Sequence, residues 1–179
     1  MVSNLKNKNV KINIFRAILI IGLLGTFIVI FGFSSQNAEE SGGLSEKVTI
    51  TVTKNVKKIQ DLEQTQKERV LSRIENVIRK IAHFSIYTLV GFLLMALFST
   101  YNLKDRNRIL ASFVIGAIYA SSDEIHQRFV NGRSAQVTDV MLDTLGVLFG
   151  ILILMLILQI VDRKKKKVLQ NKSNLNTEK

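Results

Sequence analysis

The sequence predicts an all-α integral membrane protein, built as a four-helix bundle of transmembrane spans with the N and C termini in the cytoplasm. Three observations predict it: four long apolar segments, basic clusters between them, and no proline among the 179 residues. Hydrophobic residues make up 47% of the chain, and the mean hydropathy is +0.21. A helix rising about 1.5 Å per residue needs about twenty apolar residues to cross a hydrocarbon core of roughly 30 Å.

The net charge of +11 is explained by membrane topology. Short cytoplasmic loops concentrate lysine and arginine, so the basic clusters mark the inner side and give no reason to expect a nucleic-acid partner. These clusters are Lys6, Lys8, Lys11 and Arg16 before the first span, Lys104, Arg106 and Arg108 in a short loop, and residues 163–167 after the last span. The chain has no cysteine, which excludes disulfides and thiolate-ligated metals.

The predicted spans cover about residues 14–33, 81–101, 109–127 and 139–161. Residues 1–13 form a cytoplasmic basic arm, and residues 162–179 form a basic cytoplasmic tail that we expect to be disordered. The uncharged part of the third span stops at Ser122 and covers only about 21 Å. The helix must therefore continue through the polar residues that follow, which places them at the outer interface.

The outer loop, residues 34–80, contains a periodic apolar pattern formed by Val48, Val52, Val56, Ile59 and Leu62. Steps of three and four residues predict one face of a helix. A strand over residues 49–53 is the alternative, because these residues are β-branched and alternate. A second helical pattern begins near Val70 and runs into span two. We therefore expect two amphipathic helices on the outer membrane surface.

Polar residues from three distant segments converge at the outer side in this topology. They are Arg79 and His83 at the start of span two, residues 123–127 at the end of span three, Arg133 in the outer turn, and Asp139 and Asp143 at the start of span four. The last two acids are four residues apart on one helix and repel each other. A cation must lie beside them, supplied by the protein or by a bound ion.

This cluster has two interpretations, a buried ion-pair network that fixes the helix register or a site for a substrate or ion. Nitrogen and oxygen ligands for Zn²⁺ or Mn²⁺ are available from His83, Asp123, Glu124, His126, Asp139 and Asp143. The spacing matches no recognised metal motif, since the sequence has no H-E-x-x-H. No cofactor is therefore expected, and a divalent metal is the alternative.

Catalysis without a metal is the other reading of the cluster. A histidine with a neighbouring carboxylate can act as a general base near neutral pH. The candidate catalytic residues are His83, Asp123, Glu124, His126 and Asp139. Their substrate would be a lipid-linked or cell-wall precursor presented at the outer leaflet. Whether the protein is an enzyme stays open from the sequence.

Several short motifs, in order along the chain, resemble the VanZ-like membrane proteins. They are Phe33-Ser34-Ser35-Gln36, Arg79-Lys80-Ile81-Ala82-His83-Phe84 with Tyr87, Asp123-Glu124-Ile125-His126-Gln127, Gly132-Arg133, Asp139-Val140 and Asp143-Thr144-Leu145-Gly146. Two features depart from the family pattern. Asn131 stands where relatives often have proline, and the insert at about residues 42–76 is longer than the family core needs.

The resemblance implies a small multi-span protein of bacterial plasma membranes, associated with resistance to teicoplanin-type glycopeptides. It favours a functional site at the polar cluster. To the catalytic candidates we add as ligand-binding candidates Arg79, Gln127, Arg133, Gln136, Asp143, Ser35, Gln36 and Tyr87. The expected partners are membrane lipids and an envelope precursor. An ion- or proton-coupled transporter and a non-catalytic scaffold are the alternative functions.

Overall fold

The structure is a computed structural model that describes residues 2–132 and 136–177. Over these residues the chain forms helices and no strand, so the all-α prediction is confirmed. The helices are α1 (Val2–Ser34), α2 (Ala38–Thr53), α3 (Lys57–Gln60), α4 (Gln64–Ser99), α5 (Asp105–Gln127) and α6 (Val137–Thr177). The segment 49–53 is helical, which rules out the strand alternative.

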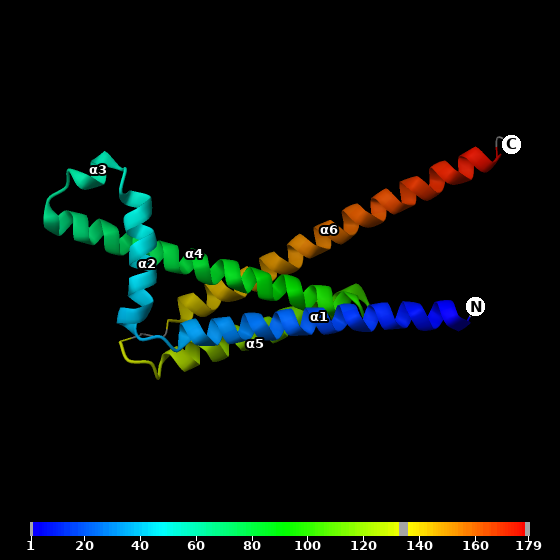
Figure 1. Cartoon of the computed structure of the whole chain (residues 1–179), viewed down its shortest axis with the longest axis horizontal. Coiled ribbons are helices and arrows are strands. Elements are labelled where there is room, and N and C mark those ends of the chain that lie inside the picture. The colour runs from blue at the N-terminus through cyan, green and yellow to red at the C-terminus, as the bar shows by residue number, and fades with distance from the viewer. Residues whose placement is uncertain (1, 133–135, 178–179) are drawn as a thin grey trace.

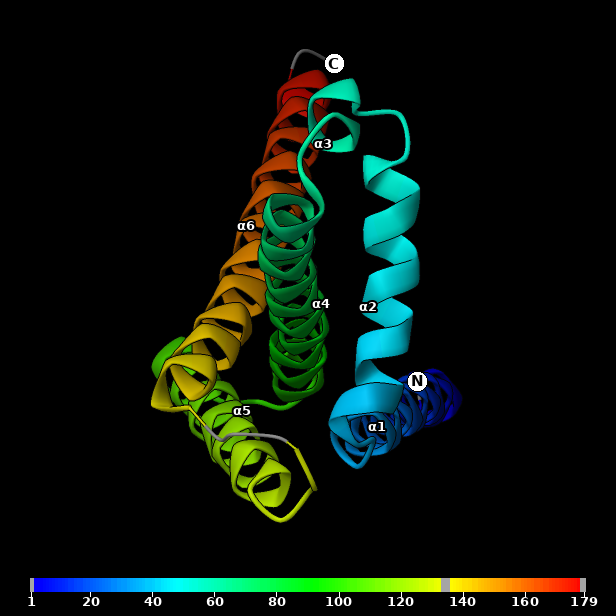
Figure 2. The same cartoon turned by 90° about the vertical axis from the view of Figure 1, so that its left-hand side faces the viewer.

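Helix α4 lies at the centre of the fold and contacts α1, α2, α5 and α6, while α5 also contacts α6 and α1. The two chain termini lie at one end of the molecule, and α2 and α3 lie at the other (Figure 1). Viewed from that second end, α4 lies between α6 on one side and α2 on the other, with α5 and α1 below it (Figure 2). We call the end that carries α2 and the α5–α6 connection the polar end.

Three helices are long and apolar enough to cross a membrane, within Asn9–Ser34, Gln64–Ser99 and Val137–Asn171. Helix α5, the remaining predicted span, has 23 residues but is not among them. Many large apolar side chains face outward, such as Ile21 (69% exposed) and Ile28 (71% exposed) on α1. A surface this apolar belongs in lipid or against a partner.

Both ends of the chain are more helical than the sequence predicted. Helix α1 begins at Val2, within the predicted arm, and α6 continues to Thr177 through the tail expected to be disordered. The tail residues 163–167 are lysine and arginine, which are good helix formers, and neither segment contains a proline to end the helix. Because α6 continues as a helix, residues 163–167 lie away from the packed interior.

Glycines allow α4 and α6 to pack backbone to backbone. A methyl group at Gly150 would overlap the carbonyl oxygen of Thr88, and one at Gly91 would overlap the carbonyl oxygen of Val147. At Gly146 the added carbon would lie 2.7 Å from the carbonyl oxygen of Phe84. Small residues at such spacing are typical of tightly packed membrane helices. Below the polar end the buried core is apolar and includes Val90, Leu94, Val147 and Ile151.

Helix α2 buries small polar residues, while Val48 and Val52 are exposed, which is compatible with the predicted amphipathic helix on the membrane surface. The periodic set is interrupted because α2 ends at Thr53, and Val52 is 63% exposed. The buried face is Ser45, Thr49 and Thr53. The hydroxyls of Thr49 and Thr53 donate to carbonyls one turn back in α2, at 2.8 and 2.7 Å, whereas Ser45 Oγ donates across to Glu75 Oε1 on α4 at 2.9 Å. Small polar residues thus let α2 approach α4 closely.

Candidate functional site

A polar cavity of about 320 Å³ lies between α4, the end of α5 and the start of α6. We call it the polar pocket. It is lined by Asn76, Arg79, Lys80, His83, Glu124, Gln127, Gly132, Gln136, Asp139, Leu142 and Asp143. The lining comes from two segments far apart in the sequence, residues 76–83 and 124–143, and seven of these residues were candidates from the sequence. Gly132 has φ of 79°, a conformation that favours glycine, and it turns the chain between α5 and α6.

Three potential metal ligands meet at the base of the polar pocket. One side-chain ligand atom from each of His83, Asp123 and Asp143 lies within 4.8 Å of the others. Asp123 is 5% exposed and Asp143 is 1% exposed, whereas the His83 side chain is 27% exposed toward the cavities. His83 Nδ1 lies 3.5 Å from Asp143 Oδ2, a long distance for a hydrogen bond. We call these three residues the buried triad.

The carboxylate of Asp123 accepts one hydrogen bond within α5. Gln127 Nε2, one turn along the helix, donates to Asp123 Oδ2 at 3.3 Å. Tyr87 on α4 is completely buried, and its hydroxyl has no hydrogen-bond partner among the described residues. Helical spacing of four places His83 and Tyr87 on one face, so both reach the interior from consecutive turns. The position of Asp123 is therefore fixed from α5, and the Tyr87 hydroxyl is a second polar group buried near the triad.

Further polar contacts close the rim of the pocket. Lys80 Nζ donates to Asp139 Oδ1 at 2.6 Å, linking α4 to α6. The backbone N–H of Gln136 donates to Glu124 Oε1 at 2.6 Å, which ties the start of α6 to α5. Arg79 Nη2 contacts Glu75 Oε1 at 3.3 Å within α4. The predicted cation beside Asp139 is thus Lys80, which belongs to the Arg79–His83 motif but was not among the predicted ligand-binding residues.

The charges of the pocket do not balance. Arg79 and Lys80 supply two positive charges, while Glu124, Asp139 and Asp143 supply three carboxylates. The carboxylate of Asp123 lies within the triad and adds a fourth. Glu75 also engages Arg79, so part of one positive charge is already used. With a neutral imidazole, the site carries excess negative charge at a buried position, where charge is costly unless it is paired.

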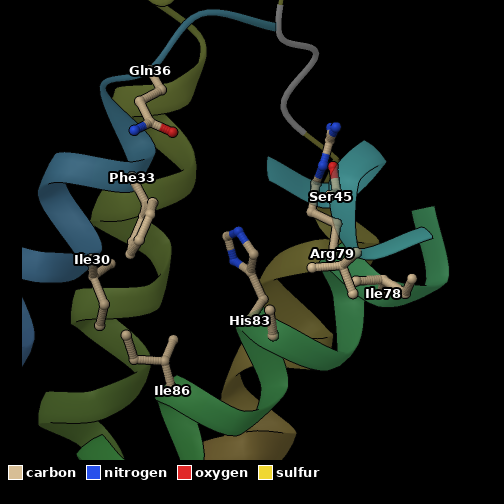
Figure 3. A pocket seen from close by; sticks show the side chains of 10 residues that line it. Ile30, Phe33, Gln36, Ser45, Ile78, Arg79, His83 and Ile86 are labelled. Carbon is tan, nitrogen blue, oxygen red and sulfur yellow. The ribbon is translucent and has the colours of Figure 1, made fainter. Parts of the chain in front are cut away.

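A second cavity of about 300 Å³ adjoins the first and is almost wholly apolar. We call it the apolar pocket. Its lining comes from α1, α2 and α4 and is Ile30, Phe33, Gln36, Ser45, Val48, Ile78, Arg79, Ala82, His83 and Ile86. His83 projects from α4 toward the side occupied by Ile30 and Phe33, with Arg79 one turn away (Figure 3). Arg79 and His83 therefore line both pockets.

Some predicted site residues lie elsewhere. His126 turns toward α1, where its Nε2 lies 3.1 Å from Ser35 Oγ and its ring stacks on Phe31. Gln36 lines the apolar pocket and not the polar one. Arg133 lies outside the described residues. The buried triad is thus assembled from His83, Asp123 and Asp143, with Glu124, Gln127, Gln136 and Asp139 around it.

Sequence reasoning missed the apolar pocket. Its signal was present on α4, where Ile78, Ala82 and Ile86 recur every four residues beside the Arg79–His83 row. Because this apolar row lies directly beside the polar row of Arg79 and His83, the boundary between the two pockets runs along α4. The contribution of Ile30 and Phe33 from α1 had no local signal, because their row is as apolar as the rest of that helix.

Comparison with known proteins gives one family. The VanZ/LLP1 family matches residues 18–158, which include the two middle predicted spans, most of the first and last, both pockets and the buried triad. No characterised protein and no solved structure gave a match. The match covers most of the chain and agrees with the resemblance carried by the short motifs. The protein, with three helices able to span a membrane, is a membrane protein and belongs to the VanZ/LLP1 family.

Proposed function

We propose that the chain is a multi-pass protein of the bacterial plasma membrane that binds an amphiphilic component of the cell envelope at its outer leaflet. Four spans, α1, α4, α5 and α6, would place both termini in the cytoplasm. The arrangement of charge supports this topology, since the basic tail and the 104–108 loop lie toward the end of the fold that carries the termini. The polar pocket would then open on the extracytoplasmic side.

One observation carries the proposal: Arg79 and His83 form a wall common to an apolar pocket and a polar pocket. A molecule with a hydrocarbon part and a polar head would fill both, with the hydrocarbon between α1, α2 and α4 and the head beside α5 and α6. Ligand sites generally combine an apolar lining with a few placed polar groups. A lipid-linked precursor has this two-part chemistry.

Binding or modifying such a component would lower the effect of teicoplanin-type glycopeptides, as the family resemblance implies. Sequestration alone is sufficient for that outcome. If a chemical step occurs, His83 is the residue placed to take part, because it faces both pockets and contacts Asp143. A carboxylate behind an imidazole orients the ring and supports a general base.

The test is teicoplanin susceptibility in a host that depends on the full chain for protection. We expect His83→Ala and Asp139→Asn, at wild-type abundance in the membrane, to reduce protection to that of the empty vector. Ser85→Ala is the control, since Ser85 lies on the exposed side of α4 and bonds only to its own helix at Ile81. Full protection by both pocket variants would overturn the proposal.

A non-catalytic scaffold is a second candidate, favoured by α2. Ile50 is 52% exposed and Val52 is 63% exposed, so α2 presents partly uncovered apolar side chains. A partner or the membrane surface could cover them. If scaffolding were the function, Ile50→Ser with Val52→Ser would abolish protection, whereas Asp143→Asn would retain it.

A further inference from the structure

The buried triad contains a carboxylate that the described protein leaves incompletely paired. Asp143 is 1% exposed, and its Oδ1 is buried without a hydrogen-bond partner among the described residues. Its Oδ2 has the 3.5 Å contact with His83 Nδ1. An ionised carboxylate at this depth requires a counter-charge. The position of Asp143 at the base of a pocket allows that counter-charge to come from outside the chain.

The neighbouring cations do not meet this need. Lys80 is engaged by Asp139, and Arg79 is engaged by Glu75. A protonated His83 would neutralise only one of the two triad carboxylates. A divalent cation with a neutral imidazole and the carboxylates of Asp123 and Asp143 has no net charge. One divalent ion therefore balances both carboxylates at once, whereas protons would have to bind both His83 and one of the carboxylates.

The spacing of the triad also fits a metal. Ligands about 2.0–2.2 Å from a tetrahedral ion are separated from one another by about 3.3–3.6 Å. His83 Nδ1 and Asp143 Oδ2 are 3.5 Å apart, which is long for a hydrogen bond and suited to two ligands of one ion. All three ligand atoms lie within 4.8 Å of one another, so small side-chain movements complete the set.

Groups around the triad are placed as supports for a metal ligand. The Asp123 carboxylate accepts a hydrogen bond from Gln127, and the Tyr87 hydroxyl nearby is buried with no hydrogen-bond partner among the described residues, so it is free to support a ligating carboxylate. Such contacts fix the orientation of ligating carboxylates in metal sites. His83 and Asp143 also line the polar pocket, so coordination positions not used by protein would face that cavity. An anionic oxygen of a bound head group could occupy them.

We propose that His83, Asp123 and Asp143 bind a divalent transition-metal ion that faces the polar pocket and recognises an anionic oxygen of its occupant. A set of one imidazole and two carboxylates suits Zn²⁺ or Mn²⁺ better than it suits the oxygen-seeking Mg²⁺ and Ca²⁺. The role of the ion rests on the proposed function, whereas its binding does not. The ion would also remove the excess negative charge that otherwise repels an anionic head group.

The experiment uses the purified full chain in detergent, stripped with chelator and equilibrated with Mn²⁺ or Zn²⁺. After removal of free ion we expect about one ion per chain by elemental analysis, with Kd rising at least about tenfold in His83→Ala and Asp143→Asn. Asp139→Asn is the matched control, since it makes the same change one turn away in the same pocket. Size-exclusion profiles and melting temperatures show that the variants are folded.

Electron paramagnetic resonance of the Mn²⁺-loaded wild type provides a measurement that needs no variant. We expect a protein-bound signal with coupling to an imidazole nitrogen. A wild type that retains no ion, retains only Mg²⁺ or Ca²⁺, or lacks nitrogen coupling would overturn the metal site, as would equal losses in Asp139→Asn and Asp143→Asn. If the wild type binds no metal but the pocket variants still lose teicoplanin protection, the metal site is refuted and the proposed function is not. If the wild type binds metal but the pocket variants protect fully, the proposed function is refuted and the metal site is not.

Discussion

His126 on α5 and Ser35, the residue that follows α1, meet at the polar end, with His126 Nε2 3.1 Å from Ser35 Oγ. The same ring stacks on Phe31 with 4.7 Å between centroids. His83, the other histidine of the chain, belongs to the buried triad instead. The two histidines therefore have different surroundings although both belong to the predicted polar cluster.

We expect His126→Ala to leave metal content and teicoplanin protection unchanged while it lowers stability by about 1–2 kcal/mol, through the lost contact and ring stacking. His83→Ala should show the reverse pattern, losing metal and protection with little change in melting temperature. Metal content, susceptibility and thermal unfolding in detergent are measured on both variants. Equal effects on all three readouts would show that the histidines share one role.

The glycines between α4 and α6 yield a second prediction. Gly150→Ala should destabilise the fold by about 1–3 kcal/mol, because the new methyl group would press on the Thr88 carbonyl and force the helices apart. The melting temperature in detergent measures this. Gly25→Ala is the control, since no atom lies within 4 Å of a methyl group placed there. Equal melting temperatures for the Gly150→Ala and Gly25→Ala proteins would contradict this packing.

Arg16 anchors the inner part of α1 to the end of α4. Its Nη2 donates to the Thr100 carbonyl at 2.7 Å, its Nε donates to Thr100 Oγ1 at 2.9 Å, and its guanidinium lies 4.0 Å from the Tyr101 ring centroid. Lysine retains the charge that orients the span but loses the planar fork. We therefore expect Arg16→Lys to cost about 1–2 kcal/mol in thermal unfolding.

The outcome for Arg16 is checked against Lys11→Arg, which keeps a cation at an exposed position of the same helix. That variant should have the same melting temperature as the wild type. If Arg16→Lys also had the wild-type melting temperature, the contacts at Thr100 would contribute nothing measurable to stability, and Arg16 would act only as an orientation signal.

Sequence periodicity predicted the helices and the convergence of polar residues well, because apolar spans and basic loops leave one arrangement for Arg79, Asp123 and Asp143. It could not predict which way each side chain turns at the polar end. His126 and Gln127 are adjacent in sequence, yet one faces α1 and the other faces the triad. The direction of each side chain depends on how α5 packs against its neighbouring helices, and a local sequence pattern does not predict that packing.

The same limit explains two other differences. Gly146 and Gly150 form a G-x-x-x-G that is common by chance in apolar segments, so only the structure shows that it meets α4. The valines of α2 predicted an amphipathic helix on the membrane surface, but no pattern predicted that Thr49 and Thr53 would be buried, where close approach to α4 favours small side chains. Apolar periodicity predicts burial reliably in water, whereas lipid also accepts exposed apolar residues.

Tyr87 allows a test of the support around the metal ligands. Tyr87→Phe keeps the buried ring but removes the hydroxyl beside Asp123. Removing such a support typically weakens metal affinity by about 10–100-fold. We expect that loss in Mn²⁺ affinity with melting temperature nearly unchanged. Tyr119→Phe is the matched control, since the Tyr119 hydroxyl donates to the Phe27 carbonyl at 2.9 Å, away from the triad ligands. The same affinity in both variants would remove Tyr87 from the site.

The interior beneath the triad argues against coupled transport. A pathway for protons or ions needs polar groups through the membrane, and intramembrane ionisable residues normally mark it. The buried side chains that follow Tyr87 along α4 are Val90, Leu94 and Met95, and they pack on Val147 and Ile151 of α6. We therefore expect proteoliposomes to show no more proton flux than empty vesicles, with or without a pH gradient. Flux that Asp143→Asn abolishes would contradict this expectation and favour the transporter, because the carboxylate would then relay charge across the apolar core.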